Sequence, residues 1–324
     1  MKKKQTNNLK QKNESKSFKT KKRIFIFNID PQNDEITSFF LSQKINDLLV
    51  KHQDDVIYIF LTKFSLNTLL KYFKKIFTLK TGYIISSSGS CIYSIANKKI
   101  LYSHTLTSPA KSFLVHEGIL KSLLIISDSK SKGYCYSEDI KKFVKFKDVF
   151  GSDITLIDSY LIYHNFIHEN DFLSFTFYDT DIDILNQKYG KIKLVEDDLN
   201  INISPIENNM FSASSAESLP IDAYYKVLEH LNYQINIDKT YYFVLNSLDM
   251  TFWNTFLKHH YLNFQYLVSN KNSIATQLTI QNIFLPKNVV EIIESLISET
   301  SSFRIHSIVS DEKNFIELRK QESK

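Results

Sequence analysis

Apolar runs alternate with amphipathic segments along the first hundred residues of the chain. Residues 24–29 and 56–61 are almost entirely apolar, which is typical of strands buried on both faces. Segments 38–51 and 66–77 instead place apolar residues three and four positions apart, the spacing of a helix that packs on a sheet. A third short strand is expected over 83–86. This alternation predicts an α/β fold with a doubly wound, parallel, Rossmann-like sheet.

A second block of apolar strands and short helices occupies residues 107–205, and we interpret it as an inserted α/β cap. Its expected strands are 123–127, 172–178, 192–195 and 201–203, and its expected helices are 138–146 and 181–189. After Pro205 the first pattern resumes. We expect helices over 221–231, 250–259 and 286–297, the last capped near Asn288, and strands over 241–245 and 266–268.

These patterns divide the chain into a core of residues 23–106 and 206–299, the cap at 107–205, and two flanking segments. Residues 1–22 carry nine Lys and one acidic residue, which is a net charge of +8, and the rest of the chain therefore has 5 − 8 = −3. We expect this basic tail to be disordered, either as a solvated segment or as one that contacts nucleic acid or an anionic surface. The cap and the C-terminal extension, 300–324, are candidate surfaces for a protein partner.

Composition narrows the class of protein further. Apolar residues make up 43% of the chain, enough for a sizeable core, and no run of about 18 apolar residues predicts a membrane span. The two cysteines, Cys91 and Cys135, form neither a metal-binding spacing nor a disulfide framework, which fits a reduced, cytoplasmic setting. Glycine is scarce, 6 residues of 324, although phosphate-binding loops commonly need it.

Two polar residues end the first predicted strand. Side chains alternate across a strand, so Asn28 and Asp30 project in the same direction at its carboxyl end. In open α/β sheets this is where ligands bind. Two carboxylates at these positions would indicate a phosphoryl-transfer site, but the first of the pair is an amide.

A longer stretch of sequence carries a family resemblance. It reads Tyr83-Ile-Ile-Ser-Ser-Ser-Gly89-Ser-Cys-Ile-Tyr93, followed by Lys98-Lys-Ile-Leu101. It resembles the "YxIxxNGAxIY…GxxL" stretch of the haloacid dehalogenase (HAD) superfamily, specifically its Cof-type phosphatases with a large α/β cap. The gap from Asp30 to Thr62 (62 − 30 = 32) also fits that family. The resemblance extends over about residues 23–298.

The resemblance implies hydrolysis of phosphate monoesters in two steps. In such enzymes one Asp attacks phosphorus to form an aspartyl-phosphate, and a second Asp protonates the leaving oxygen and then activates water. A hydroxyl and a Lys neutralise the phosphate, and Mg²⁺ bridges it to carboxylates. On this chain, the nucleophile position falls on Asn28, the acid/base position on Asp30, the phosphate-binding hydroxyl on Thr62, and a metal-binding carboxylate on Asp249.

Several positions depart from the family pattern. Asn28 carries a carboxamide, which is a very poor nucleophile; the Lys of the third motif falls near Pro220, and the first metal-binding Asp of the fourth motif is Leu245. Lys226 lies too far along its helix to replace the missing Lys. Other motif positions are also changed, at Pro31, Lys63, Val244 and Leu248. With Asp249 alone, or with Asp30, Mg²⁺ would be held only weakly.

Two interpretations follow from these losses. In the first, a protein with this phosphatase fold has lost its activity and acts by binding a ligand or a partner. In the second, it is a weak or specialised Mg²⁺-dependent phosphatase of sugar phosphates or nucleotides, with Asp30 as the base. The retained residues also suit structural roles, because Asp30 can bind a turn amide and Thr62 and Asp249 can cap helices.

Histidines offer weaker candidates. His164 and His168 are four residues apart, but no acidic residue of the H-E-x-x-H type accompanies them, so the sequence alone does not predict a zinc site. His259 and His260 are adjacent and do not form such a pair.

Overall fold

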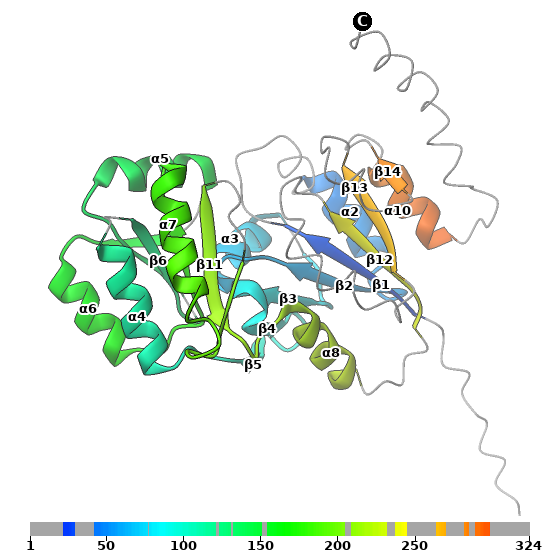
Figure 1. The fold of residues 1–324 in the computed structure, drawn as a ribbon. Coiled ribbons are helices and arrows are strands. Elements are labelled where there is room, and N and C mark those ends of the chain that lie inside the picture. Colours follow the sequence, from blue (N-terminus) through cyan, green and yellow to red (C-terminus); the bar gives the residue numbers. More distant parts are fainter. Residues whose placement is uncertain are drawn as a thin grey trace, which may run out of the picture.

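The computed structural model describes residues 22–29, 42–76, 78–120, 123–130, 132–150, 154–204, 209–231, 237–244, 264–269, 282–284 and 289–298. Two sheets lie side by side in Figure 1, one of eight strands and one of six. Each has helices packed on it. None of the helices in the described ranges combines the length and apolar character needed to cross a membrane.

The eight-stranded sheet has the order β14-β13-β12-β1-β2-β3-β4-β5. Its strands are β1 (Lys22–Asn28), β2 (Val56–Leu61), β3 (Tyr83–Ser86), β4 (Cys91–Ser94), β5 (Lys99–Ser103), β12 (Ile237–Val244), β13 (Phe264–Ser269) and β14 (Asn282–Phe284). The strands from β14 to β3 are parallel, whereas β4 and β5 add an antiparallel edge. The doubly wound α/β sheet predicted from the sequence is confirmed.

Helices cover both faces of this sheet. On one face, alternate side chains of β1 such as Phe25 and Phe27 pack with α2 (Gln43–Lys51), α3 (Leu66–Ile76) and α10 (Val289–Ser298). On the other face, Ile24 and Ile26 pack with α8 (Pro220–His230). Because both faces are buried, the central strands β1 and β2 are largely continuous apolar runs, and β2 is buried along its whole length.

The six-stranded sheet has the order β10-β11-β9-β6-β7-β8. Its strands are β6 (Leu124–Asp128), β7 (Gly133–Tyr136), β8 (Ile154–Ile157), β9 (Ser174–Tyr178), β10 (Ile201–Ile203) and β11 (Met210–Ser215), and its helices are α4 (Ser108–Ile119), α5 (Ile140–Phe150), α6 (Tyr160–Glu169) and α7 (Ile182–Lys193). All its neighbouring strands are antiparallel except β7 and β8.

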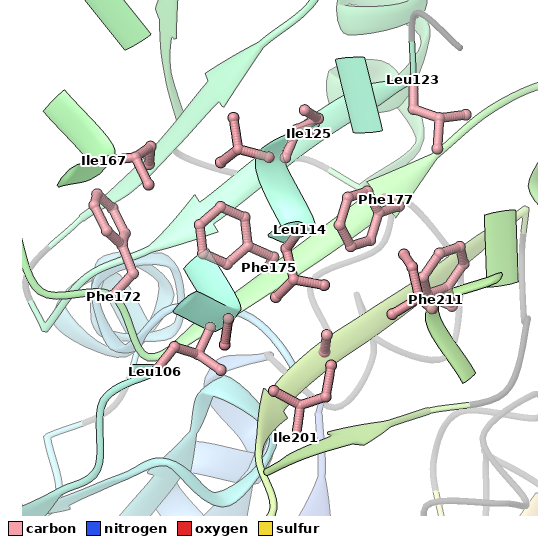
Figure 2. Packing of buried hydrophobic residues seen from close by; sticks show 14 of the residues in the cluster. Leu106, Leu114, Leu123, Ile125, Ile167, Phe172, Phe175, Phe177, Ile201 and Phe211 are labelled. Carbon is pink, nitrogen blue, oxygen red and sulfur yellow. The ribbon is translucent and has the colours of Figure 1, made fainter. Parts of the chain in front are cut away.

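One face of the six-stranded sheet carries a core shared with α4, α6 and α7. Figure 2 shows Leu114 of α4 beside Phe175 of β9, with the rings of Phe177 and Phe211 next to each other. The latter two rings stack with their centroids 4.9 Å apart. The opposite face, which includes Phe146 of α5, belongs to a separate cluster that reaches the eight-stranded sheet.

Some predicted boundaries differ from the structure. The expected strand over 192–195 is wrong, because this segment is the end of α7 and the turn after it. The six-stranded sheet continues through β11 to Ser215, beyond residue 205 where we placed the end of the cap. The division into domains itself remains a prediction. The expected helix over 250–259 and the flanking segments 1–21 and 299–324 lie outside the described residues.

Candidate functional site

The carboxyl ends of β1, β2 and β3 meet at one edge of the eight-stranded sheet. Two backbone hydrogen bonds continue the ladder beyond the strands: Ile29 N–H donates to the Leu61 carbonyl at 2.8 Å, and Thr62 N–H donates to the Ile85 carbonyl at 2.9 Å. Neighbouring strands are about 4.8 Å apart. The polar residues that end these strands therefore lie close together, and we call Asn28, Thr62, Lys63 and Ser87 the strand-end site.

Asn28 is the last residue of β1 and is only 1% exposed. It follows Ile24 and Ile26 in the alternation that faces α8. Neither its Oδ1 nor its Nδ2 has a hydrogen-bond partner among the described residues. A buried polar group without a partner costs about 1–3 kcal/mol, so this carboxamide is a place where a bound molecule would restore missing hydrogen bonds.

Thr62 is fully buried directly after β2. Its Oγ1 accepts a hydrogen bond from the backbone N–H of Phe64 at 3.2 Å. It does not cap α3, because the Ser65 hydroxyl accepts from Thr68 N–H at 3.3 Å and takes that role. The structural alternative of Thr62 as a helix cap is therefore wrong, and the hydroxyl instead stabilises the turn that orients the next two residues.

Lys63 is a buried cation, with 8% of its surface exposed. It lies in a small cavity between the two sheets, lined also by Thr176, Ser204 and Ser212. The cavity has room for about one water molecule. The hydroxyls of Ser204 and Ser212, which line the same cavity, are 2.9 Å apart.

Phe64 joins the two sheets. It is 2% exposed and packs into the apolar cluster of the six-stranded sheet, which includes Phe146, Tyr178 and Met210. The ring centroids of Phe64 and Phe146 are 6.4 Å apart, in an edge-to-face arrangement. The eight-stranded sheet thus places an aromatic anchor directly beside the strand-end site.

The loop after β3 has an unusual backbone. Ser87 and Ser88 adopt positive φ angles of 50° and 55°, and Gly89 follows with 101°. A Cβ at Gly89 would lie 2.4 Å from the carbonyl oxygen of Ser218, just before α8 begins at Pro220. The loop therefore packs tightly against the start of α8. The buried Ser87 hydroxyl has no hydrogen-bond partner among the described residues.

The structure describes only part of the predicted site. It brings Asn28 and Thr62 to adjacent strand ends, whereas Asp30 and Asp249 lie outside the described residues. Pro220 is the first residue of α8, as the motif alignment requires. The ammonium of Lys226 lies over the ring of Tyr102, 3.4 Å from its centroid, in a cation–π contact.

Other candidates are inert or separate from this site. Burial raises the pKa of the Cys91 thiol to about 11, an effect that the neighbouring Ser86 hydroxyl only partly offsets. Burial also raises the pKa of Cys135. Both cysteines are therefore protonated and weakly nucleophilic near neutral pH. No group of three or more His, Cys, Asp or Glu within the described ranges could hold a metal ion.

An α/β sheet of this topology, interrupted by a second sheet above its strand ends, is the fold of the HAD-like hydrolases. Among solved structures, a haloacid dehalogenase-like hydrolase from Bacteroides thetaiotaomicron is similar, with a TM-score of 0.65, 11% identity, and coverage of 85% of this chain and 100% of that chain. One from B. subtilis gives a TM-score of 0.63, 11% identity, and coverage of 85% and 99%.

A third similar structure is a HAD subclass IIB sugar phosphatase, with a TM-score of 0.61, 10% identity, and coverage of 85% of this chain and 97% of that chain. No protein-family model matches the sequence, and a comparison with curated proteins finds no match. At such low identity the likeness establishes the fold. The observed fold agrees with the resemblance to Cof-type phosphatases that we found in the sequence.

Sequence reasoning missed two members of the strand-end site, Lys63 and Ser87, and the aromatic anchor Phe64 beside it. Lys63 was seen only as a substitution in the second motif, Phe64 only as its neighbour, and Ser87 only as part of the resembling stretch. The available signal was their position directly after strands. The burial of Lys63 and Phe64 involves residues more than eighty positions away, such as Thr176 and Phe146, which no local pattern reveals.

Proposed function

We propose that this protein binds a phosphate-bearing small molecule at the strand-end site and does not hydrolyse it through an aspartyl-phosphate. The observation that supports this most strongly is Asn28, a buried carboxamide without a hydrogen-bond partner among the described residues, at the position where a nucleophilic carboxylate would stand. The amide nitrogen of a carboxamide can donate a hydrogen bond to a phosphate oxygen. Its oxygen is too weakly nucleophilic to attack phosphorus.

Charge at the site also favours an anionic ligand. Lys63 is a buried cation next to Thr62, and the Ser87 hydroxyl has no hydrogen-bond partner among the described residues. A buried ammonium interacts strongly with phosphate because the surrounding dielectric is low. The cavity beside Lys63 is small, so a ligand larger than water would enter only with movement of the segments around it.

Magnesium fits the described part of this site poorly. Its residues offer a carboxamide, hydroxyls and an ammonium group, whereas Mg²⁺ prefers one or two carboxylates together with phosphate and water. Asp30 and Asp249 are the two carboxylates that could hold the ion, with Asp249 the weaker expectation. We derive no catalytic step through the metal.

A second candidate is a weak or specialised Mg²⁺-dependent phosphatase acting on sugar phosphates or nucleotides. The similar structures favour it, because they include hydrolases and a sugar phosphatase, and they support it at least as well as they support loss of activity. Direct attack by water would be required, with Asp30 as the base. A single general base contributes about 10²–10⁴-fold, a small part of what phosphate-monoester hydrolysis needs.

Binding of inorganic phosphate and of tungstate, measured by calorimetry, tests the first proposal. The unmodified chain should bind both anions, and Lys63→Ala should weaken binding because the buried cation is lost. Lys99→Ala, on the exposed edge strand β5, is the matched control and should bind like the unmodified chain. Equal binding by all three proteins, or none by any, would contradict the proposal.

Partner binding remains a separate proposal for segments outside the strand-end site. The basic tail, the cap and the C-terminal extension are its candidate surfaces. If the tail holds an anionic surface or nucleic acid, deletion of residues 1–22 should remove a salt-sensitive affinity for anionic vesicles or single-stranded DNA. An unchanged affinity would rule the tail out.

A further inference from the structure

Two histidines on α6 form a close pair outside the strand-end site. His164 and His168 are one helical turn apart, and their Nε2 atoms are 3.2 Å from each other. Their ring centroids are 4.4 Å apart. Helix α6 packs on one face of the six-stranded sheet, and the cluster that holds Phe64 lies on the opposite face. The histidine pair is therefore remote from the strand-end site.

The distance between the two nitrogens suits a shared metal ion. Imidazole nitrogens bind Zn²⁺ at about 2.0–2.1 Å, and two such ligands whose nitrogens are 3.2 Å apart would subtend an angle of about 100° at the ion. This angle lies between the values for square-planar and tetrahedral coordination, which Cu²⁺, Ni²⁺ and Zn²⁺ adopt. The separation of the two nitrogens is therefore compatible with both of them binding one ion.

The surroundings leave the remaining coordination positions open. His168 is exposed and His164 is half-buried, so water can complete the coordination shell. Tyr163 and Ile167, which directly precede the two histidines, are buried against the sheet and therefore hold this part of α6 in place. Lys111, a cation that interacts electrostatically with His168, donates a hydrogen bond from its ammonium to the backbone carbonyl of Asn170 at 2.7 Å.

We infer that His164 and His168 form a surface binding site for one divalent first-row transition-metal ion, with preference for Cu²⁺. The preference follows from the general affinity order, in which Cu²⁺ binds nitrogen ligands more tightly than Ni²⁺ or Zn²⁺. The alternative is a plain hydrogen bond, in which one imidazole donates its Nε2–H to the other. That arrangement would need no ion.

Titration of the full-length protein with Cu²⁺, followed by calorimetry and by electron paramagnetic resonance, tests the inference. We expect one site with nitrogen coordination. The variant His164→Ala/His168→Ala should weaken binding at that site by more than tenfold, since even loss of a group outside the ligand shell costs about 10–100-fold. The matched control His259→Ala/His260→Ala removes the other closely spaced pair in the sequence and should leave that site unchanged.

Two results would overturn the inference. Binding that is the same in the His164→Ala/His168→Ala variant would place the ion elsewhere, and loss of binding in the control variant would assign it to the adjacent pair. Circular dichroism of each variant checks that α6 and the rest of the fold survive. None of these outcomes depends on whether the protein binds phosphate.

Discussion

Asn28 and Asn46 are both 1% exposed but differ in their hydrogen bonds. The Oδ1 of Asn46 accepts from Thr78 N–H at 2.8 Å, whereas the carboxamide of Asn28 has no partner in the described structure. At the scale of single residues, this contrast separates an amide that makes a structural hydrogen bond from one that makes none with the described residues.

Replacing each of these residues with Leu should therefore have opposite effects. Asn46→Leu should lower the free energy of unfolding by about 1–3 kcal/mol, because it leaves the Thr78 N–H unpaired. Asn28→Leu should leave the free energy unchanged or raise it, and should abolish phosphate binding. Chemical denaturation with and without phosphate measures both effects. Equal destabilisation by the two changes would contradict the proposed role of Asn28.

Gly89 and Gly190 are a second pair of positions at which the same substitution should have opposite effects on stability. Gly89→Ala should lower the free energy of unfolding by more than about 1 kcal/mol, because φ is +101° and the new Cβ would lie 2.4 Å from the Ser218 carbonyl oxygen. Gly190→Ala, in α7 with nothing within 4 Å of the new Cβ, should raise it by about 0.5–1 kcal/mol. Thermal or urea unfolding of the two variants measures both changes in the free energy of unfolding. No loss of stability in Gly89→Ala would show that the loop can relax.

Asp128 makes stability depend on pH. Burial raises the pKa of this carboxyl from 3.8 to about 7, although the Ser174 hydroxyl donates to it at 3.4 Å. The folded state holds the proton more tightly than the unfolded state, so stability should fall as pH rises from about 4 to about 7. Asp128→Asn should remove this dependence, gaining at most about 4 kcal/mol above pH 7. Urea denaturation of the unmodified chain and of Asp128→Asn at about pH 5 and pH 8 tests this prediction. The same change of stability with pH in both proteins would contradict it.

At the scale of elements, the contact between the two sheets depends on Phe64. Phe64→Ala should lower the free energy of unfolding by about 3–5 kcal/mol, because a buried ring is lost from a cluster that spans both sheets. Leu161→Ala on α6 is the control, since this side chain is 65% exposed and should change stability by less than about 0.5 kcal/mol. If the two variants are equally stable, Phe64 does not join the sheets.

Elements were predicted well where one pattern dominated. The six apolar residues of β2 can form little other than a buried strand, and the Pro at the start of α8 fits the first turn of a helix. The segment 192–195 was misjudged because a short apolar run suits a helix end as well as a strand. Strand β11 was missed because buried serines occupy half of its positions, where apolar residues are expected in a buried strand.

The candidate site was predicted less completely than the fold. Alternation along β1 correctly placed Asn28 at a strand end, since it depends only on local geometry. The contact of Phe64 with Phe146, and the cavity beside Lys63, depend on how the six-stranded sheet lies over the strand ends. Such long-range packing leaves no periodic signal in the sequence.

At the scale of the whole molecule, the fold is that of the HAD-like hydrolases, and the residue at the end of β1 is Asn28. A scaffold can persist when its activity is lost, because packing and catalysis depend on different residues. The decisive question is therefore whether the side chains of this protein catalyse the release of phosphate from phosphomonoesters above the background rate.

The most direct measurement is Mg²⁺-dependent phosphate release from a panel of sugar phosphates and nucleotides by the full-length protein. The control is the double variant Asp30→Ala/Asp249→Ala, which removes both remaining carboxylates of the motifs. Our account predicts that the two proteins release phosphate at the same background rate. Turnover by the unmodified chain that requires Mg²⁺ and disappears in the double variant would contradict it and establish the phosphatase function instead.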